Sequence, residues 1–153
     1  MQSGQAPTNA GSYRFVVTVS INEADRDLYV LPNGENTVTF SFDFEIQKKV
    51  IDISSFGFAE DVEFNFDGSA HTLDFHGYGN EFINYGVIEY YKPNSDGPGL
   101  TSIDEPVPVY RGYYTCRIWL SIKPEYSANC VFSDGKTTTI IQGTYSIVQA
   151  PTT

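Results

Sequence analysis

The stretch "TVTFSFDFEI", residues 37–46, alternates polar and apolar side chains without a break. Successive side chains of an extended chain point to opposite faces, so this pattern predicts a strand with one apolar face and one polar face. The apolar side chains are Val38, Phe40, Phe42, Phe44 and Ile46. A strand of this kind is expected to turn its apolar face toward a core and its polar face toward water.

The same period of two recurs along the chain, and helical spacing of apolar residues does not. Asx-Gly pairs at Asn33-Gly34, Asp67-Gly68 and Asp134-Gly135 interrupt the periodic runs, as tight turns require. Strands are predicted near residues 14–21, 28–31, 37–46, 50–53, 61–66, 71–76, 82–91, 107–122, 128–133 and 137–148. We therefore expect an all-β fold without long helices: a single-domain antiparallel β-sandwich, jelly-roll or Ig-like Greek key, of roughly eight to ten strands.

Both ends of the chain have the composition of a tether. "QAPTN" stands at residues 5–9 and "QAPTT" at 149–153, and such Gln, Ala, Pro and Thr residues do not build a core. The sequence predicts a flexible linker at residues 1–12, one domain over residues 13–148, and a flexible tail or linker at residues 149–153. The longest irregular stretch, residues 92–108, is expected to form an exposed loop.

The core can be predicted from the same alternation. In residues 107–122 the even positions end in Cys116, Ile118, Leu120 and Ile122, which identifies the buried face of that strand. The residues expected to be buried together are Val38, Phe40, Phe42, Phe44, Ile118 and Leu120. Both cysteines, Cys116 and Cys130, fall on apolar faces, as two buried thiols or as one disulfide.

The acidic net charge disfavours anionic partners. The formal net charge is −10, and the resulting field repels phosphate backbones and anionic lipid headgroups. No run of 18 apolar residues occurs, and the first residues lack the basic and apolar regions of a signal peptide. We expect no nucleic-acid partner and no membrane insertion.

The sequence carries none of the motifs of nucleophilic, zinc-dependent or phosphate-binding enzymes, so we expect no catalytic residues and no cofactor. The stretch "EFNFDGSAHTLD", residues 63–74, has oxygen-bearing residues at the spacing of a calcium loop, but it lies in a strand context. A hairpin with Asp67-Gly68 at its tip and Phe64 opposite His71 explains the same letters. No metal site is expected.

Aromatic and arginine residues gather on the face of residues 107–122 that points away from the predicted core. This face holds Arg111, Tyr113, Arg117 and Trp119, and Tyr90 and Tyr91 lie in the preceding predicted strand. Trp, Tyr and Arg dominate binding hot spots because they combine large rigid area with polar groups. Either these six residues form a binding surface, or another part of the chain covers Trp119 in a second small core.

The predicted function is a non-enzymatic recognition or assembly module on the outside of a larger assembly. Such a module serves attachment, adhesion or protein–protein contact, as in a capsid or a phage spike or protruding domain, and its setting is extracellular, cell-surface or virion exterior. Its partner is a protein, a further copy of the chain in a homo-oligomer, or a glycan receptor. The alternatives are a carbohydrate-binding module that uses exposed Trp and Tyr, and a small β enzyme.

Overall fold

The computed structural model describes residues 5–152 as an all-β protein with twelve strands and three short 3-10 helices. The chain divides into two compact units: residues 1–48, of which 5–48 are described, and residues 49–153, of which 49–152 are described. The sequence predicts one domain across residues 13–148, and this boundary falls inside that range. The first four residues of the predicted linker and the last residue of the predicted tail lie outside the described residues.

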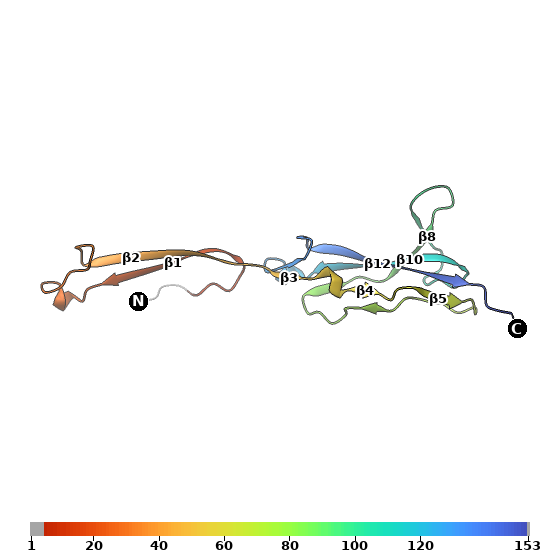
Figure 1. The fold of residues 1–153 in the computed structure, drawn as a ribbon, viewed down its shortest axis with the longest axis horizontal. Helices are drawn as coiled ribbons and strands as arrows, with labels where there is room; N and C mark the ends of the chain where they lie inside the picture. The colour runs from red at the N-terminus through yellow and green to blue at the C-terminus, as the bar shows by residue number, and fades with distance from the viewer. Residues whose placement is uncertain (1–4, 153) are drawn as a thin grey trace. The chain divides into compact units, whose positions relative to one another are not determined.

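Unit 1 is a long β-hairpin. Strand β1 (Gly11–Ser20) pairs antiparallel with β2 (Thr37–Ile46) over ten residues of each strand (Figure 1). The connection carries the 3-10 helix η1 (Glu23–Asp25), and no strand forms at residues 28–31, where one was predicted. Asn33-Gly34 does form a turn, with Gly34 at a φ of 80°, but the turn lies within a long connection rather than joining the strands directly.

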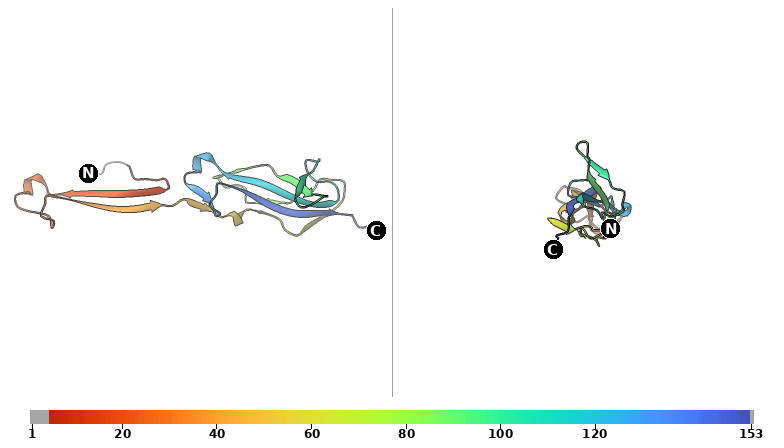
Figure 2. Two further views of the ribbon diagram at one scale, coloured as in Figure 1. Left: turned by 90° about the horizontal axis from the view of Figure 1, so that it is seen from above. Right: turned by 90° about the vertical axis from the view of Figure 1, so that its right-hand side faces the viewer.

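Unit 2 is built around one six-stranded sheet. Its central strand β10 (Gly112–Ile122) pairs antiparallel with β12 (Thr138–Val148), which lies beside it in Figure 2. The other edge of β10 pairs with β7 (Ile83–Tyr85) and with β8 (Glu89–Pro93). Beyond these, β9 (Leu100–Ser102) pairs with β8, and β5 (Val62–Asn65) pairs parallel with β12.

Two small sheets complete unit 2. Strand β3 (Lys49–Ile51) pairs parallel with β11 (Cys130–Phe132), and β4 (Gly57–Phe58) pairs antiparallel with β6 (Phe75–His76). The 3-10 helices η2 (Ile53–Ser55) and η3 (Pro124–Tyr126) lie in connections. The fold is thus all-β with several mostly antiparallel sheets that do not close.

The predicted hairpin at Asp67-Gly68 is wrong. The strand that precedes it, β5, pairs with β12 instead of folding back on residues 71–76, where only Phe75 and His76 are in a strand. His71 still reaches Phe64, because the loop brings the two rings into a stack with centroids 4.7 Å apart.

The predicted loop at residues 92–108 is partly a hairpin. Strands β8 and β9 pair from Tyr91 to Ser102, and the backbone N–H of Asn94 donates to the carbonyl of Gly99 to close the turn. This hairpin projects from the rest of unit 2 in Figure 1.

The core lies on one face of the main sheet of unit 2. Four predicted core residues of β10 are buried: Cys116, Ile118, Leu120 and Ile122. Segments from the small sheets and their loops cover them with Ile51, Phe56, Phe58, Leu73 and Phe132. Phe58 packs so closely on β12 that only a glycine fits opposite it, at Gly143.

The expectation that β2 shares this core is wrong. Phe40, Phe42 and Phe44 are exposed, Phe42 to 61%, and Val38 is only half-buried. The alternation of β2 is real, but its apolar face lies beside the apolar face of β1 in a two-stranded ribbon, and a ribbon has no second layer of its own. Ile118 and Leu120, in unit 2, are buried as predicted.

Candidate functional site

The aromatic residues predicted as a binding surface come mainly from the solvent side of the main sheet in unit 2. Because Cys116, Ile118 and Leu120 point into the core, Tyr113, Arg117 and Trp119 point away from it. The paired residues of β12 and β8 extend this side. We define the outer face by Tyr91, Tyr113, Arg117, Trp119, Ile140 and Gln142.

Two aromatic side chains dominate the exposed part of the outer face. Tyr113 is 54% exposed and Trp119 is 50% exposed, so Trp119 does not lie in a second core. Ile140, the cross-strand partner of Trp119, is also exposed. The backbone of Trp119 is fixed on its other edge, where its carbonyl accepts the N–H of Gly86 at 2.8 Å. The indole ring thus stands on a rigid strand.

Arg117 contacts two neighbouring side chains in the middle of the outer face. Its guanidinium lies 5.0 Å from the centre of the Tyr91 ring, and its Nε donates to Oε1 of Gln142 at 2.9 Å. The Tyr91 hydroxyl donates to Oε2 of Glu89 at 2.6 Å, and this hydrogen bond to a carboxylate raises the pKa of Tyr91. Thr115, which lies between Tyr113 and Arg117 on the same side of β10 and pairs with Tyr91, is buried. Polar contacts within the face therefore fix these side chains and separate its two exposed rings.

Tyr90 lies on the other side of the sheet, and Arg111 lies just before β10. Tyr90 pairs with Cys116, so its side chain turns to the core side of the sheet, where its hydroxyl contacts that of Thr72 and burial raises its pKa. Arg111 precedes β10 and donates from Nη1 to Oε1 of Gln149 at 3.2 Å. The outer face thus includes Tyr91, Tyr113, Arg117 and Trp119, but not Tyr90. The register of β8, which the sequence does not reveal, makes this distinction.

Both cysteines, which the sequence placed on apolar faces, lie in the interior of unit 2. Cys116 and Cys130 are free thiols, both buried, and burial raises the pKa of Cys116 to about 11. The described residues contain no group of three or more His, Cys, Asp or Glu side chains arranged to hold a metal ion.

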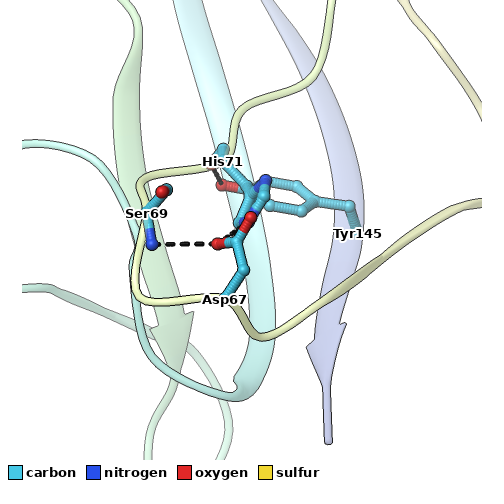
Figure 3. Close-up of polar contacts among 4 residues, drawn as sticks. All are labelled: Asp67, Ser69, His71 and Tyr145. Atoms are coloured by element: carbon cyan, nitrogen blue, oxygen red, sulfur yellow. Dashed lines mark hydrogen bonds and ion pairs between the residues drawn. The ribbon is translucent and has the colours of Figure 1, made fainter. Parts of the chain in front are cut away.

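A polar cluster surrounds His71 (Figure 3). Nε2 of His71 lies 2.8 Å from Oδ1 of Asp67, which also accepts the backbone N–H of Ser69 at 2.9 Å. The hydroxyl of Tyr145, from β12, donates to the carbonyl of His71 at 2.7 Å. The hydrogen bonds from Ser69 and then His71 lower the pKa of Asp67. These contacts tie the loop after β5 to the main sheet.

A second surface, which the sequence suggested only as a core face, is the apolar side of the hairpin in unit 1. Directly paired residues of β1 and β2 share a side, so the register joins Tyr13 to Phe44, Phe15 to Phe42, Val17 to Phe40, and Val19 to Val38. We call these eight residues the hairpin face. The reverse side is polar except for Val16 and carries an ion pair between Arg14 and Asp43 at 2.8 Å. The signal in the sequence was the alternation in both strands.

Among the described residues, no helix is long and apolar enough to cross a membrane. Comparisons with protein-family models, with curated proteins and with solved structures give no match.

Proposed function

We propose that this chain is a non-enzymatic recognition and assembly module on the exterior of a larger extracellular, cell-surface or virion-type assembly. The observation that carries the proposal is the outer face of unit 2, where Tyr113 and Trp119 stand half-exposed on the central strand of a sheet. Aromatic residues on a rigid strand lose little conformational freedom when a partner binds, which is why they act as interface anchors. The partner is a protein, a further copy of the chain or a glycan receptor.

A carbohydrate-binding module is the second candidate, because exposed Trp and Tyr rings also stack on sugars. The spacing of the rings limits this candidate. Tyr113 and Trp119 are six residues apart on one strand, which corresponds to about 20 Å. Both rings could contact only an extended oligosaccharide, since a single sugar ring does not span that distance.

The test is Trp119→Ala, with Tyr29→Ala as the control, because Tyr29 is 65% exposed and lies in unit 1. Binding is measured on a glycan panel. If Trp119 is an anchor, its removal weakens the interaction of the wild type by about 2 kcal/mol or more, roughly thirtyfold, and costs the fold little. The control is expected to bind like the wild type.

The opposite pattern would reject the outer face. A Trp119→Ala protein that is destabilised by about 3 kcal/mol or more and retains the wild-type binding would assign Trp119 a packing role. The single tryptophan also provides a direct signal, since a ligand that covers its ring should shift its fluorescence to shorter wavelength.

A further inference from the structure

The hairpin face of unit 1 is an exposed apolar surface on a hairpin that would be marginally stable by itself. Within residues 5–152, strands β1 and β2 form a sheet of two strands. A two-stranded hairpin is marginally stable at best in water, and stable sheets pack an apolar face on another layer. Phe15 and Phe42, a cross-strand pair, are exposed to 52% and 61%. A stable hairpin of this kind requires a second layer over this face.

The area of the hairpin face is large enough for a specific interface. Its four phenylalanines are each about half exposed, and a Phe side chain contributes on the order of 200 Å². With Val19, they present on the order of 450 Å² of apolar surface, which is comparable to the largest apolar patch on a typical monomer, a patch that is often functional. Two such faces in contact bury about 900 Å² of apolar area, and the polar rim brings the total above the roughly 1,000 Å² that a biological interface needs.

The charge distribution of the hairpin allows a second copy to approach. None of the eight residues of the hairpin face is charged, while Arg14, Asp43 and Glu45 project from the reverse side. Two hairpins in face-to-face contact would therefore keep these charges on the outside, although each chain carries a net charge of −10. A partner chosen by charge would find no ionic group to pair with on this face.

The sizes of the side chains specify how the copies meet. The face tapers along the ribbon, from Tyr13 paired with Phe44 at one end to Val19 paired with Val38 at the other. Packed sheets keep a nearly constant separation of about 10 Å, so large side chains pack best opposite small ones. A second copy related by a two-fold axis that lies between the two faces and perpendicular to the strands runs in the reverse direction and places its valine end over the aromatic end of the first.

We propose that two copies of this chain associate through their hairpin faces, with the hairpins antiparallel and related by a two-fold axis. The inference rests on the assembly part of the proposed function and names its partner as a second copy. It concerns unit 1, whereas the recognition part depends on Trp119 in unit 2. A failure of one can therefore be separated from a failure of the other.

The first measurement is the mass of the full chain by light scattering over a dilution series from about 100 μM, since micromolar affinity is sufficient for a dimer at that concentration. The expected result is twice the mass of one chain at high concentration. The variant Phe42→Lys should be a monomer across the series. The matched control is Ser41→Lys, which adds the same charge at the neighbouring position on the reverse side.

A wild type that stays monomeric, a mass other than the dimer, or a Phe42→Lys dimer would each overturn the proposal. So would a Ser41→Lys monomer. Because Phe42→Lys also weakens the pair with Phe15, a second experiment is independent of it: chains with Tyr13→Cys are mixed with chains with Val19→Cys and treated with a bifunctional maleimide that spans about 10 Å, the separation of packed sheets. The antiparallel arrangement predicts mainly mixed cross-linked dimers, and mainly like-with-like dimers would refute it. Trp119→Ala should leave the dimer unchanged, and loss of the dimer in that variant would overturn the assignment to the hairpin.

Discussion

Gly143→Ala tests the packing that holds the outer face in place. Gly143 lies on β12 and pairs with Cys116 of β10. A methyl group at this position would lie 2.6 Å from Cβ of Phe58 and 3.0 Å from Cδ1 of Leu73. The favourable separation of two carbon atoms is about 3.5–4.0 Å, so Phe58 would have to move by roughly 1 Å.

The expected destabilisation is about 2–3 kcal/mol. Phe58 and Leu73 are both buried, and the Phe58 ring also contacts that of Phe75 at a centroid distance of 5.2 Å, so neither side chain can yield without disturbing others. Overpacking of this kind typically costs about 1–3 kcal/mol. Backbone entropy alone would act in the opposite direction, because Gly→Ala at a permissive site stabilises a protein by about 0.4–1 kcal/mol. The sign of the change therefore decides between packing and entropy.

Urea unfolding, followed by the fluorescence of Trp119, measures this change in unit 2. With a slope of about 1–3 kcal/mol/M, the midpoint should fall by roughly 1 M. The control is Gly97→Ala, because a methyl group at Gly97 would meet no atom within 4 Å. Its midpoint should equal or exceed that of the wild type. A Gly143→Ala protein within about 0.5 kcal/mol of the wild type, or more stable than it, would refute the close packing of Phe58 on β12.

Two further predictions concern the interior and the loop of unit 2. Cys116 and Cys130 should react slowly with iodoacetamide in the native protein at pH 8 and rapidly in urea. The reason is that both thiols are buried and the pKa of Cys116 is raised to about 11. Fast labelling of the native protein, or a disulfide in the intact mass, would contradict this prediction. The pKa of Asp67 is lowered from 3.8, so its ionised form contributes stability that is present above its unfolded pKa and is lost as the pH falls through the folded value. Asp67→Asn should therefore flatten the decline in melting temperature below about pH 4, and an unchanged acid decline would argue against these hydrogen bonds.

Local alternation was sufficient to predict individual strands and the direction of their side chains. Residues 37–46 form β2 with the predicted bounds, and the buried even positions of β10 follow directly from the period of two. The pleat of a strand is a local property, so a local pattern determines it. The outward direction of Tyr113, Arg117 and Trp119 could be predicted for the same reason.

Partners across the sheet could not be predicted, because pairing depends on contacts between residues far apart in the chain. The turn chemistry of Asp67-Gly68 favoured a hairpin, yet β5 pairs with β12, where Phe64 packs its ring against that of Tyr145. The register of β8 likewise places Tyr91 on the outer face and Tyr90 on the core side, a distinction that no period within residues 82–91 reveals.

Burial was the property that only the tertiary structure decided. Phe42 and Ile118 occupy equivalent positions in equally regular alternating stretches, but Phe42 is 61% exposed and Ile118 is fully buried. The alternation indicates that a strand has an apolar face. Burial of that face requires a second layer that covers it. In unit 2 that layer includes Phe58 and Leu73, whereas in the described part of unit 1 the two strands form a separate two-stranded sheet.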